Sequence, residues 1–472
     1  MNQPSTTLRA LVLVGLAFLA AACSDTPVSV TPQVPAPSLS VQDVGPSGNY
    51  VLAVNNRAYT TVMSRIADLG GTVVRAHQGA GIIDAGGLSA GAAATLSSMA
   101  GVRAMIADEW IQGAPLPPDL RVESATAATT SGDPSDAFFW ANQWDMRVIH
   151  ADDAWYDGHD GSSSVTVAII DTGIDPFHQD LAGLVDASRS IAFVSSVNSA
   201  GPSWGDDYFH GTHVAGTVAS NGLGTWGVAP HTTLVAVKVC NSEGSCPLGA
   251  IFSGILYAAD IGANVGNLSL GGFIAKNATD GGQLNAIYNQ VVDYATRKGM
   301  LLVSAAGNDG VDLDHLGRDY RAGSYTSVPC EAGNGVCVSA TGPTDVIAGY
   351  SNYGISAVNV AAPGGDGAAV GSIHGEVMGP CSSLTVVPGL AACTISPTYY
   401  VWAQGTSMAA PHVTGAAALL AAAGVTSPAN LVIALQQTAD DLGKPGTDPF
   451  YGKGRLNVSA LLNAPAFARL AR

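Results

Sequence analysis

The chain has 472 residues, a formal net charge of −17, 47% hydrophobic residues and only 12% charged residues. Its length exceeds that of one ordinary compact domain, and its apolar content excludes an intrinsically disordered chain. The negative charge argues against nucleic acid as a partner, because phosphate contacts need a basic surface.

Residues 1–22 have the pattern of a secretion signal: Arg9, then an apolar run from Leu11 to Leu19 that is too short to span a bilayer, then three alanines. Cys23 follows directly. Small residues before a cysteine resemble a bacterial lipoprotein processing site, although Ala20 stands where that pattern prefers Leu. A lipidated Cys23 would attach the protein to a membrane; ordinary cleavage beside a stray cysteine is the alternative. Residues 23–47, rich in Pro, Ser, Val and Thr, predict a linker or tether.

Residues 48–113 are predicted to form a small α+β open sandwich of order βαββαβ. Within it, Gly87–Gly91 fits the nucleophile elbow of α/β-hydrolases, but it follows a Gly-rich turn rather than a strand, so we set it aside. Residues 114–135 carry several prolines and no core pattern, which predicts a processing linker. The expected strands are 50–54, 72–75, 81–84 and 102–106, and the expected helices are 59–69 and 89–99.

Residues 136–472 alternate apolar strands with helical runs. This alternation predicts an α/β domain with a doubly wound, mainly parallel sheet and helices on both faces. The expected strands are 165–170, 233–239, 265–270 and 300–306, and the expected helices are 249–261 and 283–298.

Four polar side chains stand at the ends of such elements. Asp171 follows a buried strand, at the edge where open α/β sheets place their sites. His210 opens a helix of small residues; with His213 it could form a metal pair, but no glutamate stands between them. Asn308 lies in a Gly-rich turn, where its amide serves either the backbone or an oxyanion. A turn aspartate is the structural alternative for Asp171.

Ser407 begins a helix that we expect to end at Gly424, with Pro411 in its first turn. A serine there caps a helix far more often than it acts as a nucleophile. Acyl transfer, however, needs a nucleophile, a base, a carboxylate that orients the base, and a donor to the oxyanion. Ser407, His210, Asp171 and Asn308 supply these four groups.

In their residues and order these motifs resemble the subtilisin-like serine proteases, and the resemblance covers most of residues 137–462. It implies a serine endopeptidase that needs no cofactor for catalysis, acts on protein or peptide substrates, and carries residues 48–113 as its own intramolecular inhibitor. It further implies that 267–272 includes the strand that pairs with substrate, and that 452–458 is a terminal strand. Asp180 matches a segment that gives a calcium ligand in relatives; a surface turn aspartate is the alternative. The resemblance places the substrate-binding residues at Ser269, Leu270, Gly271, Gly272, Ser304, Ala305, Ala306 and Gly307.

Seven cysteines are present, and without Cys23 six remain, for which fifteen pairings exist. Short separations favour three local disulfides, as expected in an oxidising compartment. A zinc site is the alternative, but the spacings differ from those of zinc motifs and no histidines cluster with the cysteines. The predicted pairs are Cys240 with Cys246, Cys330 with Cys337, and Cys381 with Cys393.

We therefore expect a monomeric endopeptidase, secreted or attached to a bacterial cell envelope and made as an autoprocessed zymogen. A non-catalytic surface-binding protein on a protease fold is the alternative from another class, and an esterase or peptide ligase on the same scaffold is a third. The walls of the primary pocket carry no acidic residue, which favours large apolar side chains in substrates over Lys or Arg.

Overall fold

The structure, a computed structural model, describes residue 1 and residues 48–117, 120–125, 133–275, 281–314 and 325–464. The expected signal segment and Cys23 lie outside these residues. The helices and strands of the described ranges all belong to one compact unit within Ala36–Arg472. Within the described ranges, no helix is both long and apolar enough to cross a membrane.

Residues 48–107 have the expected βαββαβ order, and we call them the N-terminal unit. Its four strands form one antiparallel sheet in the order β2-β3-β1-β4. Leu52, Ile66, Ile83 and Leu96 are fully buried between the sheet and its two helices, which gives this unit a core of its own. Its elements are β1 (Tyr50–Val54), α1 (Tyr59–Asp68), β2 (Thr72–His77), β3 (Ile82–Gly86), α2 (Ala90–Ser97) and β4 (Val102–Ala107).

A seven-stranded sheet in which every pairing is parallel forms the centre of the remaining chain. The chain adds strands on one side of β7 first and then crosses to the other side. The strand order therefore reverses beside β7, the position at which open α/β sheets bind ligands. In sheet order the strands are β16 (Val360–Pro363), β15 (Val336–Thr341), β13 (Leu301–Ala305), β11 (Val265–Leu268), β7 (Thr166–Asp171), β9 (Thr233–Lys238) and β8 (Ile191–Ala192).

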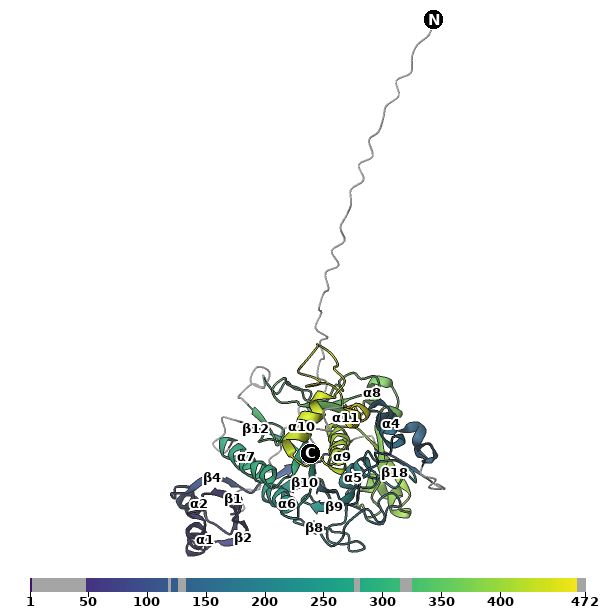
Figure 1. The fold of residues 1–472 in the computed structure, drawn as a ribbon. Helices are drawn as coiled ribbons and strands as arrows, with labels where there is room; N and C mark the ends of the chain where they lie inside the picture. The colour runs from purple at the N-terminus through teal and green to yellow at the C-terminus, as the bar shows by residue number, and fades with distance from the viewer. Residues whose placement is uncertain (2–47, 118–119, 126–132, 276–280, 315–324, 465–472) are drawn as a thin grey trace. The chain divides into compact units, whose positions relative to one another are not determined.

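Helices pack against these strands in two groups, as a doubly wound sheet requires. Helix α9 (Thr406–Ala422) contacts β11, β13, β15 and β16 and packs against α5 (His210–Val218) (Figure 1). Helix α6 (Leu248–Asp260) contacts β7, β9 and β11, while α7 (Gly281–Arg297) contacts β13 and α6. The remaining helices are α3 (Trp144–Val148), α4 (Ala151–Tyr156), α8 (Gly367–Val370), α10 (Pro428–Gln437) and α11 (Val458–Asn463), with short 3-10 turns at 134–136, 140–142, 373–375 and 388–395.

Small residues let α9 and α5 approach their neighbours closely. A Cβ added at Gly415 of α9 would lie 2.6 Å from Val228 Cβ, and one added at Gly216 of α5 would overlap the ring of Pro380. Helix α9 is buried from Thr406 to Ala421, so its Ala- and Gly-rich composition reflects dense packing on all sides.

Two details differ from expectation. Helix α9 begins at Thr406 and contains Pro411 in its second turn, not its first. Residues 452–458 form no regular strand; Gly452 and Arg455 make isolated bridges to Val360 and Ala361, and Val458 already belongs to α11.

Part of the predicted linker forms a strand that its composition did not indicate. Residues Arg121–Ser124 form β6, which pairs antiparallel with β18, so this part of the linker belongs to the larger domain. Alternating side chains pack here, with Val122 beside the core and Trp402 Nε1 donating to Glu123 Oε1 at 3.0 Å. The other short strands are β5 (Trp110–Gln112), β10 (Ser245–Pro247), β12 (Gly272–Ala275), β14 (Tyr325–Val328), β17 (Val377–Pro380) and β18 (Tyr399–Ala403).

The three local disulfides are formed, with S–S distances of 1.99, 1.89 and 2.07 Å. All six sulfurs are thus engaged, and no group of three or more His, Cys, Asp or Glu residues able to hold a metal occurs in the described part of the chain.

Candidate active site

Asp171 and His210 form a buried pair at the carboxyl edge of the sheet. Asp171 ends β7 and is fully buried; His210 begins α5 and is 5% exposed. His210 Nδ1 donates to Asp171 Oδ1 at 2.8 Å, and the backbone N–H of Thr172 donates to the same oxygen at 2.7 Å. A carboxylate on Nδ1 fixes the imidazole tautomer and leaves Nε2 available as a base.

Further buried charges surround this pair. Burial lowers the pKa of His210, but attraction to Asp171, the hydrogen bond to Asp171 and attraction to Asp206 outweigh it and raise that pKa above its usual value. Burial raises the pKa of Asp206 to about 6, against the opposing charge of Lys238. Lys238 is fully buried and pairs with Asp207 Oδ1 at 2.6 Å. A lysine within the apolar strand β9 was the signal in the sequence that could have revealed this charge cluster.

Ser407 lies in the first turn of α9 and is 8% exposed. Pro411 has no N–H, so the Ser407 carbonyl, four residues earlier, lacks its helical partner. Ser269 Oγ donates to that carbonyl at 2.7 Å, and Ser407 Oγ donates to the Ser269 carbonyl at 3.0 Å. Transfer of the hydroxyl proton to His210 requires Ser407 Oγ to turn from Ser269 to the imidazole; such bonds often form only once substrate is bound.

Side chains of β11 extend this link. Asn267 Nδ2 donates to Ser269 Oγ at 2.9 Å, and Thr414 Oγ1 of α9 donates back to Asn267 Oδ1 at 2.8 Å. The nucleophile helix is therefore tied to the central strand by a closed chain of hydrogen bonds.

The side-chain amide of Asn308 lies at the same helix end and contacts it through its oxygen. Its Oδ1 accepts from Thr406 N at 2.8 Å and from Thr406 Oγ1 at 2.9 Å, which leaves Nδ2 as a donor. The N–H groups at the start of α9 add a positive dipole end. Gly405, at φ +153, takes a backbone conformation that is essentially restricted to glycine, and a Cβ there would lie 3.3 Å from Asn308 Nδ2.

The other two histidines near these motifs have structural partners. His213 is fully buried, Nε2 donates to the Val377 carbonyl at 3.2 Å, and burial lowers its pKa to about 3. His412 of α9 donates to the Met408 carbonyl at 2.8 Å and pairs with the buried Asp145 at 3.1 Å. The link between Asp145 and the nucleophile helix was not anticipated from the sequence.

The two predicted pocket walls lie next to each other. Leu268, the residue before Ser269, is paired with Ser304 in neighbouring strands. A Cβ added at Gly271 would lie 3.3 Å from the Val328 carbonyl oxygen and 3.8 Å from that of Ala305. Ser269, Leu270, Ser304, Ala305 and Ala306 are buried, and Gly271, Gly272 and Gly307 are partly exposed.

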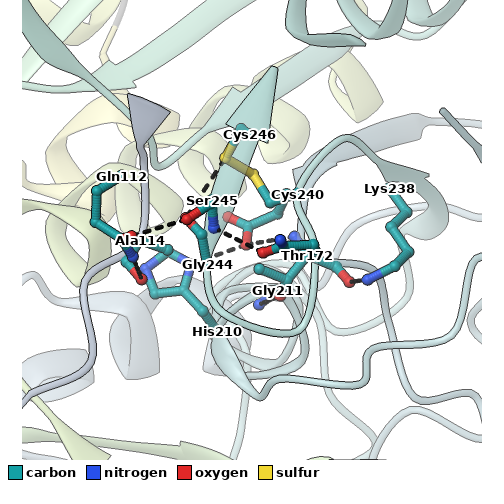
Figure 2. The surroundings of a disulfide bond; sticks show 12 residues. Gln112, Ala114, Thr172, His210, Gly211, Lys238, Cys240, Gly244, Ser245 and Cys246 are labelled. Atoms are coloured by element: carbon teal, nitrogen blue, oxygen red, sulfur yellow. Dashed lines mark hydrogen bonds and ion pairs between the residues drawn. A yellow bond between two sulfur atoms is a disulfide. The ribbon is translucent and has the colours of Figure 1, made fainter. Parts of the chain in front are cut away.

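A segment of the chain itself lies along β10, a strand that the sequence did not single out, while the expected pairing of 267–272 with substrate stays a prediction. β10 pairs antiparallel with β5, the segment that follows the N-terminal unit, in the register Gln112 opposite Ser245 and Ile111 opposite Cys246. The N–H groups of Gly113 and Ala114 both donate to the Gly244 carbonyl, at 3.1 and 3.0 Å. Figure 2 shows Gln112 and Ala114 beside Gly244 and Ser245 and next to the disulfide. The short separation of Cys240 and Cys246 marked this loop as constrained but did not reveal its partner.

The surroundings of Asp180 do not fit a calcium ion. Its carboxylate is fully buried and accepts from the backbone N–H groups of Leu223, Gly224 and Thr225. Tyr400 Oη donates to Oδ2 at 2.6 Å. Calcium requires oxygen ligands, whereas hydrogen-bond donors occupy this carboxylate.

Comparison with known proteins identifies the family. The model of the subtilase family, Peptidase_S8, matches residues 162–454, which include Asp171, His210, Asn308 and Ser407. This chain belongs to the subtilase family. The resemblance of its motifs to the subtilisin-like proteases and the α/β fold are thereby confirmed, and the protein is a subtilisin-like serine endopeptidase.

Relatives and solved structures agree with this assignment. Thermitase of Thermoactinomyces vulgaris is 35% identical over 328 residues, covering 69% of this chain and 97% of the relative. Subtilisin DY of Bacillus licheniformis is 37% identical over 322 residues, covering 67% and 96%. The structure of the epidermin leader peptide processing serine protease of Staphylococcus aureus has a TM-score of 0.69 at 24% identity, covering 88% and 98%. At that identity the likeness shows the fold alone.

We expect Asn308→Ala to lower kcat by roughly two to three orders of magnitude, as when a subtilase loses one oxyanion donor. Asn308→Asp is the matched control, because it keeps the acceptor for Thr406 and removes only the N–H donor. Both variants should lose kcat in steady-state assays. A change in KM alone, or full activity of the Asp variant, contradicts an oxyanion role for Nδ2.

We expect Asp180 to stabilise the protein without calcium. Asp180→Ala leaves several buried N–H groups unpaired and should cost about 2 kcal/mol or more. The drop in Tm relative to wild type should be equal in calcium and in excess chelator, measured by calorimetry. A wild-type Tm that falls on chelation while that of Asp180→Ala does not would restore the calcium site.

Proposed function

We propose that this protein hydrolyses peptide bonds through an acyl-enzyme on Ser407. His210 Nε2 takes the hydroxyl proton as Ser407 Oγ attacks the carbonyl carbon, and it then protonates the leaving amine. Asp171 holds the imidazole and stabilises its charged form. The observation that carries the proposal is the buried Asp171–His210 pair at the start of α5, together with Ser407 in the first turn of α9, which packs against α5.

The oxyanion is stabilised by Asn308 Nδ2 and by N–H groups at the start of α9. These are protein groups, so the proposed reaction needs no cofactor for catalysis. The walls formed by 269–272 and 304–307 carry no charge, which supports a preference for large apolar side chains in the primary pocket.

We further propose that residues 48–113 are an inhibitory propeptide. The N-terminal unit docks on α6 and α7: Gln283 Oε1 accepts from Met105 N at 2.7 Å, and Asp108 Oδ1 accepts from Gly249 N at 2.8 Å. Residues 110–114 then lie along β10 as an added strand, a common mode of peptide recognition. A segment that occupies the peptide-binding edge excludes substrate.

The processing site is proposed to lie between Ala114 and Arg121. Residues up to Ala114 are held at β10, and residues from Arg121 are held by β18. A cut between them frees the propeptide and leaves β6 with the enzyme.

The sequence supports a secreted or envelope-attached location. The segment 1–22 resembles a secretion signal, Cys23 offers a lipid attachment site, and three disulfides suit an oxidising compartment. We propose a monomer with protein or peptide substrates.

We expect the purified full chain to process itself, whereas Ser407→Ala keeps the propeptide covalently attached. Loss of one hydroxyl leaves helix propensity no worse, so the variant should fold. Gel electrophoresis with N-terminal sequencing measures the cut, and a serine-directed phosphonate labels the nucleophile. Normal self-processing by the Ser407→Ala protein, or an unlabelled wild type, would favour a non-catalytic binding protein on the same fold.

Two carboxylates at the propeptide interface suggest how release depends on pH. Burial raises the pKa of Asp84 to about 6, although Arg75 pairs with it at 2.6 Å. Burial also raises the pKa of Asp108. A Cβ added at Gly249 of α6 would lie 3.0 Å from an oxygen of each, so docking on α6 places both carboxylates together.

We expect the cut propeptide to stay bound in acid and to dissociate as pH rises. If docking raises the pKa of Asp84, the protonated carboxyl favours the complex. This contribution to binding is complete below about pH 4, the pKa of a free carboxyl group, and it is lost as the pH rises to about 6. Size-exclusion chromatography of the processed protein measures the bound fraction. Asp84→Asn should remove most of the pH dependence, while Asp68→Asn, an exposed carboxylate of α1, should not. Equal retention of wild type at pH 4 and pH 8 contradicts this mechanism of release.

A further inference from the structure

The peptide segment held at β10 contains a glycine in a closed site. Gly113 is buried, and a Cβ added to it would lie 2.7 Å from Cys246 Sγ and 3.2 Å from Leu270 Cδ2. Both neighbours are buried, and the sulfur is fixed in a disulfide, so neither can withdraw as a flexible side chain would. The site that holds Gly113 therefore excludes even one methyl group.

The residue before this glycine is held by its side chain. Ser245 Oγ donates to Gln112 Oε1 at 2.9 Å, and Gln112 Nε2 donates to the Glu243 carbonyl at 2.9 Å. One hydroxyl and one carbonyl thus contact the two ends of the amide. A carboxylate would meet the Glu243 carbonyl with no proton to donate, and an aliphatic side chain would satisfy neither group.

The shape of the loop depends on its disulfide. Cys240 and Cys246 lie 4.2 Å apart at Cα and close a tight loop, in which Gly244 has φ +72. A Cβ at Gly244 would overlap the Ala114 carbonyl oxygen, so the loop also follows the peptide backbone closely. Figure 2 shows the disulfide close to Ser245, in the same loop as Gly244.

We propose that the loop Cys240–Cys246 is a second specificity determinant of this protease, besides the primary pocket, and selects peptides that carry a Gln-Gly pair at the positions of Gln112 and Gly113. Glycine is selected because the disulfide sulfur and Leu270 fill the space of a side chain. Glutamine is selected by Ser245 and the Glu243 carbonyl. This inference rests on the proposed function, since it assumes that substrates bind along β10 as residues 110–114 do.

The glycine requirement should be the stronger of the two. A surplus methyl group in a closed pocket typically changes kcat/KM by about tenfold to a hundredfold. The contacts of Gln112 lie at an exposed edge, where water competes, so their loss should cost about threefold to tenfold.

The test uses the wild-type enzyme obtained by activation of the full chain and a set of internally quenched peptides. The parent contains Trp-Ile-Gln-Gly followed by a short segment with a large apolar residue, and mass spectrometry locates each cut. Its Gly→Ala version should lose about tenfold or more in kcat/KM, and its Gln→Leu version about threefold or more. A Trp→Phe version, changed at the exposed position of Trp110, is the control and should differ by less than about twofold.

A second arm changes the enzyme. Cys240→Ser/Cys246→Ser should bring the Gly-to-Ala ratio of kcat/KM to within about threefold. Cys381→Ser/Cys393→Ser, which removes a disulfide elsewhere, should keep the wild-type ratio. If the first double variant fails to fold, Leu270→Ala replaces it, because it opens the other side of the same site and should also lower the ratio.

The outcomes separate this inference from the proposed function. Equal cleavage of the Gly and Ala peptides by an active wild-type enzyme overturns the selection, as does an unchanged ratio after loss of Cys240–Cys246. Failure of the folded enzyme to cleave every peptide, together with no labelling by a serine-directed phosphonate, overturns the proposed function itself.

Discussion

The position of the nucleophile depends on a hydrogen bond that its own helix does not make. Pro411 cannot donate to the Ser407 carbonyl, and a buried carbonyl without a partner costs free energy. Ser269 supplies the missing donor from the end of β11. Two further hydrogen bonds hold this helix: Thr414 in its middle donates to Asn267, and Thr406 at its start donates to Asn308. The Ser407 carbonyl, which has no partner within its own helix, thus bonds the helix to the sheet through Ser269. This bond fixes Ser407 relative to the strands that line the predicted pocket.

Buried charged side chains gather around His210 at the same edge of the sheet. Asp171, Asp206, Asp207 and Lys238 are all fully buried within a short distance of the imidazole's helix. Buried charges of one sign would be costly alone, but Lys238 pairs with Asp207, and Thr212 donates to Asp206 through both its N–H and its hydroxyl. The negative surroundings favour the charged imidazole that forms when His210 takes a proton, which is the charge that develops during acyl transfer.

The sequence was sufficient for the parts of the fold that rest on local pattern. The strands and helices have clear hydrophobic periodicity, and the triad residues stand at their ends. The three disulfides join cysteines that are close in the sequence. Strand pairings between segments far apart in the chain could not be predicted from the sequence. β6 joins β18 although its composition is that of a linker, and β5 joins β10 although neither segment has a periodic pattern that indicates a partner. The partners of Asp180 come from a loop and a strand far along the chain, so an isolated aspartate gave no means of distinguishing a cation site from an acceptor of N–H groups.

Hydrogen bonds connect Asp171 of the proposed triad to the disulfide loop Cys240–Cys246. The Asp171 carbonyl accepts from Val239 N at 2.8 Å and from Cys240 N at 3.3 Å, so the first residue of the disulfide loop is bonded to the backbone of the residue that pairs with His210. Movement of the loop would therefore also disturb Asp171, and closing it with Cys240–Cys246 stabilises both. The proposed selectivity depends on the same rigidity, because a wall that cannot yield distinguishes peptides by a single methyl group. Under the proposed mechanism, one short covalent link therefore supports both the carboxylate that orients His210 and the strand edge along which the peptide lies.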